Sequence, residues 1–201
     1  MKLIKAIPQK PLFKTPCAIT IGNFDGLHTG HQFVLKRLSG ISHQNQIPSV
    51  VISFKNHPAE ILRPERPICK ICTNEQKIKI FEKKGIDTLI LLPFTKELSE
   101  LSVEEFISNL QKNIPFSHLI LGWDATLGKN RHGNKEIVKD IAKKQNFQVE
   151  YLEQYKIDQT SVSSSAIRAC IQEGNLQEAE RLLGRPFSIY SAVLLQHTCT
   201  L

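Results

Sequence analysis

The sequence predicts an α/β protein built on a doubly wound parallel sheet, with a short helical segment near its C-terminal end. Short apolar runs alternate along the chain with amphipathic stretches of helical periodicity. The first four of five such runs are almost continuously apolar, which is typical of strands covered by helices on both faces. The connections between them are short, and a β-α-β-α order with short connections favours a parallel sheet.

Five runs are expected to form the strands, at residues 17–22, 49–54, 87–92, 118–122 and 147–152. The helices between them have recognisable starts. Two pairs have the spacing of a capping box, Thr73 with Gln76 and Ser102 with Glu105. Asn134 precedes a periodic apolar stretch and can cap a third helix.

The C-terminal part of the chain differs in kind. A polar stretch after 151 is followed by predicted helices near 165–173 and 176–183. Asn175 and Glu178 can cap the second helix, and Gly174 and Gly184 follow the two helix ends. Residues 186–201 have the pattern of a loop and one β-run without a partner. We therefore expect a domain at 1–185 and the stub of a further module at 186–201.

Composition and charge indicate a globular protein with anionic partners. The 201 residues suffice for one domain, or one domain with a short appendage, and carry a formal net charge of +7. Nucleic-acid binding is not expected, because no basic stripe with interleaved aromatic residues occurs. The one group of lysines has helical spacing and is expected to be a solvated face: Lys77, Lys79, Lys83 and Lys84.

Location and redox chemistry follow from what the sequence lacks. No run of about 18 apolar residues predicts a membrane span, and the first residues lack the apolar core of a secretory signal. Cys69 and Cys72 are spaced C-x-x-C, but no second pair completes a zinc site. We expect a cytoplasmic protein with reduced cysteines and no protein-bound metal. The sequence does not indicate an oligomeric state.

The stretch GNFDGLHTGHQ at residues 22–32 is the first candidate site. It follows the first predicted strand, at the edge where open α/β sheets bind ligands. Thr29 can cap a helix whose N-terminus would receive an anion. The apolar positions expected to face the sheet from this helix are Val34, Leu35, Leu38 and Ile41.

Two histidines and three glycines favour a phosphate site in this stretch. His28 and His31 lie near the predicted helix start, where both imidazoles could reach one phosphate. The glycines that let the backbone approach a ligand are Gly22, Gly26 and Gly30. The alternatives are a metal site, which lacks a plausible third ligand nearby, and a purely structural turn.

The stretch SVSSSAIR at 161–168 is the second candidate. A serine N-cap alone is common. Arg168, however, falls at or just past the first turn of the predicted helix, where the helix dipole disfavours a cation. A bound anion would remove this conflict, with Ser163, Ser164 or Ser165 donating to it and Arg168 neutralising its charge.

The third candidate, LGWDATLGKNRHGN at 121–134, follows the fourth predicted strand. Asp124 at this position could orient a ribose or a base. Aspartate is also common in turns, so this signal is weak by itself.

Together these segments resemble the H-x-G-H nucleotidylyltransferases, and specifically the FAD synthetase (FMN adenylyltransferase) module of bacterial riboflavin kinase/FAD synthetases. Residues 21–32 are close to that family's first motif, including the Gly-Asn-Phe-Asp-Gly that distinguishes it from other H-x-G-H enzymes. Four further segments of the chain resemble segments of that family, at residues 53–62, 91–107, 121–134 and 161–168. The stretch 182–193 resembles the join between the FAD synthetase module and the kinase module.

The resemblance implies a Rossmann-like fold and the reaction of ATP with FMN to give FAD and pyrophosphate, with Mg²⁺ accompanying ATP. It implies that His28, His31 and Arg168 act on the phosphates. The residues implied for the ATP side are Gly22, Asn23, Phe24, Asp25, Gly30, Asp124, Ser163, Ser164 and Ser165. Those implied for the FMN side are Phe54, His57, Pro58 and Leu127.

Departures from the family pattern fall mainly on the FMN side. Asn56 replaces a proline, Ala-Thr-Leu at 125–127 replaces an aromatic–Arg–aromatic run, and Ser-Ala at 165–166 replaces Thr-Arg. The Gly-x-Pro-Thr-x-Asn signature of the kinase half does not occur, so we expect a monofunctional enzyme or a fragment.

Two other functions stay open. One is an adenylyltransferase that uses a pantetheine or nicotinamide nucleotide, against which Gly-Asn-Phe-Asp-Gly argues. The other is a non-catalytic flavin- or nucleotide-binding regulator. His28, His31 and Arg168 argue against it, because a pure binder does not need to stabilise a leaving group.

Overall fold

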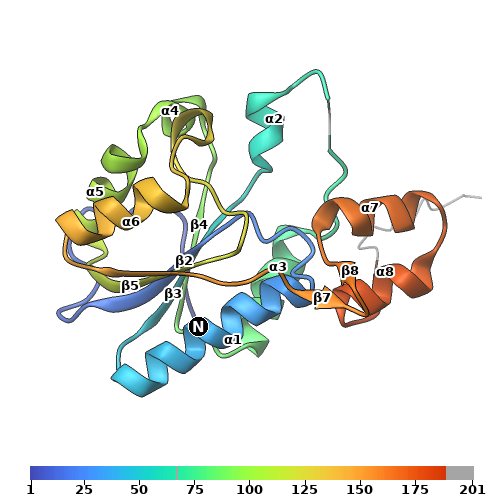
Figure 1. Ribbon diagram of the computed structural model, residues 1–201, viewed down its shortest axis with the longest axis horizontal. Coiled ribbons are helices and arrows are strands. Elements are labelled where there is room, and N and C mark those ends of the chain that lie inside the picture. Colours follow the sequence, from blue (N-terminus) through green and yellow to red (C-terminus); the bar gives the residue numbers. More distant parts are fainter. Residues whose placement is uncertain (67, 189–201) are drawn as a thin grey trace, which may run out of the picture.

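The computed structural model of the protein describes residues 1–66 and 68–188. Its centre is a six-stranded sheet in the order β1-β4-β3-β2-β5-β6, in which every neighbouring pair is parallel (Figure 1). The strands are β1 (Lys2–Ile4), β2 (Cys17–Ile21), β3 (Ser49–Phe54), β4 (Thr88–Leu92), β5 (Phe116–Leu121) and β6 (Gln148–Tyr151). The predicted parallel α/β sheet is confirmed.

All five predicted strands form, each within two residues of its expected ends. Within the six-stranded sheet, only the edge strand β1, which pairs with β4, was not predicted. It has only three residues and is largely exposed, so it carries no apolar run.

Helices cover both faces of the sheet, as a doubly wound fold requires (Figure 1). On one face, α1 (Thr29–Asn45) and α3 (Asn74–Lys83) pack on the sheet, with Leu35, Leu38 and Phe81 fully buried. On the other face, α5 (Val103–Asn113) and α6 (Lys135–Lys144) contribute buried residues such as Ile107 and Val138. The remaining short elements of this region are α2 (Pro58–Leu62), α4 (Lys96–Glu100) and the 3₁₀ turn η1 (Lys129–Arg131).

The predicted helix starts are confirmed, with one correction. Thr73 with Gln76 and Ser102 with Glu105 form reciprocal capping boxes, and the Asn134 side chain accepts from the first turn of α6. For α1 the expected cap is wrong.

His28, not Thr29, caps α1. The Nδ1 atom of His28 accepts from the His31 N–H at 3.2 Å. The Thr29 hydroxyl instead donates to the Leu182 carbonyl at 2.9 Å. The Thr29 hydroxyl thus bonds to a carbonyl far away in the sequence instead of capping its own helix.

The C-terminal segment forms the two predicted helices, α7 (Ser164–Gln172) and α8 (Leu176–Leu183), after a small hairpin of β7 (Lys156–Ile157) and β8 (Thr160–Ser161). Asn175 caps α8 as expected, accepting from the Glu178 N–H. The helices share a core of their own with Ile71, and Phe187 packs against it. Packing thus continues past the predicted boundary at 185, while the β-run expected near the chain end lies largely outside the described residues.

The sheet order defines where a ligand is expected. The strand β2 lies between β3 and β5, and the chain winds outward from β2 first through β3 and β4 and later through β5 and β6. The strand order therefore reverses at the β2–β5 pair, and ligands bind outside the carboxyl ends of such a pair. The stretches 22–32 and 121–134 both begin there.

Candidate functional site

The loop after β2 is tightly specified although it departs from ordinary backbone geometry. Phe24, Gly26 and Leu27 have φ values of 50°, 76° and 44°, in the left-handed region. For the two residues other than glycine this conformation is unfavourable and persists only where the surroundings enforce it. The side chains of Phe24 and Leu27 do so by burial in the core under α1.

Hydrogen bonds to its carbonyl groups hold the same loop from outside. Side chains from elsewhere in the chain donate to four of them, at 2.8–3.1 Å: Lys77 and Ser53 to Asn23, Ser164 to Asp25, Arg185 to Gly26, and Gln32 to Leu27. The loop is thereby fixed by residues that lie far apart in the sequence.

The two histidines of the loop are brought together, as the phosphate-site hypothesis requires. The rings of His28 and His31 stack with centroids 3.6 Å apart and an interplanar angle of 17°. His28 is buried, and the Nδ1 atom of His31 is buried without a hydrogen-bond partner among the described residues. Gly30 lies against His28, where an added Cβ would come within 3.2 Å of Nδ1. The glycine leaves room for the stacked pair.

Burial keeps both imidazoles neutral at neutral pH. Desolvation lowers the pKa of His28 to about 4, opposed by the nearby Asp25 carboxylate. Desolvation also lowers the pKa of His31 well below its ordinary value, and the neighbouring His28 and Lys77 add to this shift. Each ring can therefore donate a hydrogen bond from one nitrogen without carrying a charge of its own.

Arg168 has a counter-charge within the protein. Its guanidinium NH2 donates to Asp25 Oδ2 at 2.6 Å, and its Nε donates to the Cys69 carbonyl at 2.8 Å. The Asp25 carboxylate also accepts from the Ile71 N–H at 3.1 Å. The side chains of this ion pair are only 17% and 4% exposed. The sequence interpretation assigned the balancing anion to a ligand, and the structure supplies it from the loop itself.

The serines before Arg168 are used in different ways. Ser163 caps α7 by accepting from the Ala166 N–H at 3.1 Å. Ser164 donates to the Asp25 carbonyl at 3.0 Å, while Ser165 is exposed. The second motif thus lies directly against the first.

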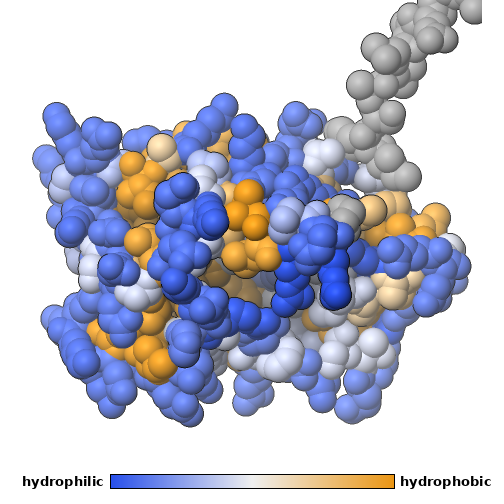
Figure 2. All heavy atoms as spheres, turned by 90° about the horizontal axis from the view of Figure 1, so that it is seen from above, coloured by the Kyte–Doolittle hydropathy of each residue, from blue (hydrophilic) through white to orange (hydrophobic). Residues whose placement is uncertain are grey.

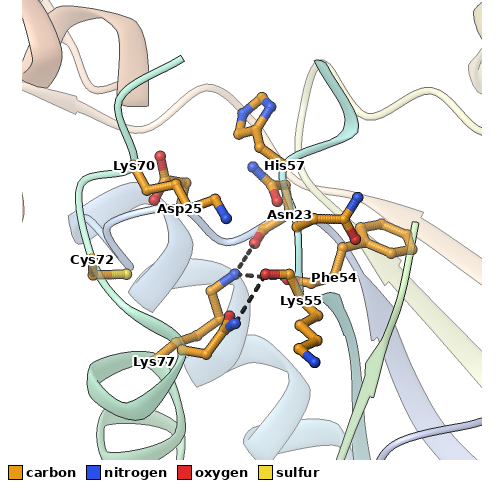
Figure 3. Close-up of a pocket in the computed structure, with 10 residues that line it drawn as sticks. Asn23, Asp25, Phe54, Lys55, His57, Lys70, Cys72 and Lys77 are labelled. Atoms are coloured by element: carbon orange, nitrogen blue, oxygen red, sulfur yellow. Dashed lines mark hydrogen bonds between the residues drawn. The ribbon is translucent and has the colours of Figure 1, made fainter. Parts of the chain in front are cut away.

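A pocket opens beside this loop at the end of β3 (Figure 3). Asn23 and Asp25 line it from the loop after β2, Phe54 from the end of β3, and His57 from the chain after β3. His57 caps α2 through its Nδ1 atom, and Pro58 occupies the first position of that helix. Asn23 and Asp25 of the predicted ATP side and Phe54 and His57 of the predicted FMN side therefore meet at one edge of the sheet. The face of the molecule seen from above is largely hydrophilic, with the hydrophobic residues in separate patches (Figure 2).

The prediction that Lys77 belongs to a solvated face is wrong. Lys77 is 4% exposed, lines the pocket and donates to main-chain carbonyls (Figure 3). Lys83 and Lys84, by contrast, are exposed on the same helix. The missed signal was the position of Lys77 four residues before the buried Phe81, on the same helix face.

Three predicted site residues do not line the pocket at the end of β3. The Phe24 ring is buried against Phe81. It also packs edge-on against the His31 ring, and the centroids of these two rings are 5.1 Å apart. Leu127 is buried in the core on the α5 side, beside a backbone bridge to Gly133. Asp124 is exposed on the loop after β5. The ligand contacts expected of these three stay predictions.

Asn56, which replaces a family proline, makes contacts that proline could not. Its amide donates to the Phe94 carbonyl at 2.9 Å and accepts from the Phe94 N–H at 2.8 Å. It thereby joins the chain after β3 to the chain after β4.

In the described part of the chain, no group of three or more His, Cys, Asp and Glu side chains could hold a metal ion. The helices there include none long and apolar enough to cross a membrane.

Comparison with known proteins fits this geometry. The FAD synthetase family model matches residues 10–166. The chain belongs to the FAD synthetase family. A protein named FAD synthetase from Listeria monocytogenes is 34% identical over 176 residues, which are 87% of this chain and 71% of the relative.

A bifunctional riboflavin kinase/FMN adenylyltransferase from Buchnera aphidicola is 37% identical over 199 residues, 96% of this chain. The chain spans 63% of the length of that relative. A solved structure described as a macrolide-efflux protein from Streptococcus pneumoniae matches with a TM-score of 0.80 and 25% identity, covering 92% of this chain and 62% of the other. This family member therefore shares both sequence and fold with longer proteins.

Proposed function

We propose that this protein transfers AMP from ATP to FMN, giving FAD and pyrophosphate. The observation that carries the proposal is the stacked pair of His28 and His31 at the N-terminus of α1, outside the β2–β5 switch point. Family membership and the pocket at the end of β3 support it.

The chemistry needs placement and charge stabilisation rather than a covalent enzyme intermediate. The phosphate of FMN is itself the nucleophile toward the α-phosphate of ATP. The helix N-terminus offers free N–H groups and the positive end of its dipole to the triphosphate. Neutral His28 and His31 would donate hydrogen bonds to it, most strongly as charge develops in the transition state. In this proposal Arg168 stays paired with Asp25 and also contributes positive charge near the β,γ end.

The magnesium ion enters as part of the substrate MgATP. Magnesium is commonly held by substrate phosphates with few protein ligands. This fits a site whose only buried carboxylate, among the described residues, is Asp25 and is already paired with Arg168. A cytoplasmic location, the absence of a nucleic-acid partner and the division at residue 185 stay predictions from the sequence.

The decisive assay incubates the purified chain with ATP, Mg²⁺ and FMN and separates FAD by chromatography. His28→Ala and His31→Ala should each lower kcat by about 10²-fold, equivalent to about 2.7 kcal/mol, with a smaller effect on the KM for ATP. His43→Ala, at the exposed far end of the same helix, is the matched control. Near-normal turnover in both site variants would contradict the assigned role of the pair.

The alternative of a non-catalytic nucleotide-binding regulator makes a different prediction. Such a protein would bind ATP or FMN but release neither FAD nor pyrophosphate. The same incubation, followed by a pyrophosphate assay, separates the two functions.

A further inference from the structure

Lys77 is a buried cation that the chemistry proposed above does not use. It extends from the first turn of α3 into the pocket at the end of β3. Its ammonium group has three donors and no acceptor, so a buried position requires several well-placed oxygen atoms. Those oxygens come from the loop after β2 and from the end of β3.

The two main-chain acceptors of Lys77 belong to two different segments of the site. Its Nζ donates to the Asn23 carbonyl at 2.8 Å and to the Phe54 carbonyl at 3.2 Å (Figure 3). Asn23 belongs to the loop after β2 that leads to the histidine pair, and Phe54 ends β3 on the FMN side. Ser53 completes the tie, because its hydroxyl lies 3.5 Å from Nζ and donates to the Asn23 carbonyl at 3.1 Å.

A purely space-filling role does not account for this residue. Burying an ammonium group carries a desolvation cost, and an apolar side chain of similar length would fill the same volume without it. The sheet already joins β2 to β3 through Gly22, whose N–H donates to the Ile52 carbonyl. The last paired residues of β2 and β3 are Ile21 and Ile52, so the bond from Lys77 to Asn23 links the loop after β2 to the end of β3 where those two strands no longer pair.

The reaction makes such a tie useful. Two bound phosphates must meet in line, and a misplacement of about 1 Å can cost about 10²-fold in rate. We propose that Lys77 is a positioning residue that fixes the ATP-side loop relative to the FMN-side strand end. This inference rests on the proposed function. Its loss should disturb the relation between two substrates more than the binding of either one.

The test compares Lys77→Met, which keeps the length of the side chain but removes its donors, with the wild type. We expect kcat for FAD formation to fall by about 30-fold or more, while the KM values for ATP and FMN change by less than about threefold. Lys77→Arg keeps a charged donor and should recover part of the lost kcat. Lys83→Met, an exposed change on the same helix, is the control and should behave as wild type.

A thermal melt of each variant checks that it is folded. If Lys77→Met does not fold, Lys77→Gln is measured in its place, because its amide can still donate to one carbonyl. Its kcat should also fall, with both substrates still bound in equilibrium titrations. The inference is overturned if a folded variant keeps its kcat within about threefold, or if only a KM rises. It is also overturned if Lys77→Arg recovers nothing, or if neither neutral variant folds, since Lys77 is then a structural residue.

The wild-type assay separates this inference from the function on which it rests. Wild-type protein that makes no FAD would overturn the proposed function, and the inference with it. Wild-type protein that makes FAD, beside an unimpaired Lys77→Met, would overturn the inference alone.

Discussion

Breaking the Asp25–Arg168 ion pair should reveal how strongly the site depends on its own internal charges. Asp25→Asn is the cleanest perturbation. The amide oxygen can still accept from the Ile71 N–H, so this change removes the negative charge while the shape and one hydrogen bond remain. Arg168 is then left largely buried without its counter-ion.

The expected magnitude follows from burial. Removing one partner of a buried pair destabilises a protein by about 3–5 kcal/mol. Because the Arg168 side chain is 17% exposed, some of its charge remains solvated, and we expect the lower end, about 3 kcal/mol. For a chain of this size, that corresponds to a decrease in Tm of about 6–12 °C.

A double-mutant cycle isolates the interaction. Urea unfolding of Asp25→Asn, Arg168→Met and the double variant should show a coupling free energy of about 1–3 kcal/mol, because the second change no longer strands a charge. The exposed pair Arg37–Glu150, with side chains 47% and 39% exposed, is the matched control and should couple by less than about 1 kcal/mol. Additivity of the Asp25 and Arg168 changes within about 0.5 kcal/mol would refute the reasoning.

Two further predictions concern acid sensitivity and backbone geometry. Because burial lowers the pKa of His28 to about 4, below its unfolded value, the native state binds fewer protons. Stability is then fully present above about pH 6.5 and is lost as the pH falls toward 4. Between pH 8 and 4.5 the free energy of unfolding should fall by about 2 kcal/mol less in His28→Asn, which can still cap α1, than in the wild type. An equal decrease in both proteins would contradict this assignment. For backbone geometry, Gly40→Ala should raise the free energy of unfolding by up to about 1 kcal/mol, since an added Cβ meets nothing within 4 Å in mid-helix. Gly128→Ala should lower it by more than about 2 kcal/mol, because φ is +72° and the Cβ would lie 2.5 Å from the Val103 nitrogen. Thermal melts of the two alanine variants, which should shift in opposite directions, check this pair.

The sheet and most helix starts could be predicted because their signals are local. Continuous apolar runs identify buried strands, and residues such as Ser102 or Asn134 satisfy helix N–H groups within their own first turn. The edge strand β1 and the two-residue strands β7 and β8 are too short to leave such a pattern. The short helix α2, which was not predicted, is capped by His57, a residue type that the usual capping rules do not include.

The position of the candidate site could be predicted from the sequence, but the contacts between its residues could not. The motif positions placed His28 and His31 together because both lie within one helical turn. The partner of Asp25 is Arg168, which is 143 residues away in the sequence, and no local pattern indicates that contact. The helical spacing of Lys77 with Lys79, Lys83 and Lys84 predicts a solvated face, but the helix turns Lys77 inward, where it is 4% exposed.

The C-terminal helices are part of the site rather than an appendage to it. The last carbonyls of a helix have no intrahelical partner, and in α8 the carbonyls of the last two residues accept from Thr29 and Gln32 of α1, each at 2.9 Å. Arg185, just after α8, donates to the Gly26 carbonyl in the loop before the histidines at 2.8 Å. The end of α8 therefore sets both the start of α1 and the loop that leads into it. The structural unit that holds the histidine pair in place extends to Arg185 at least, beyond residue 166, where the match to the family model ends.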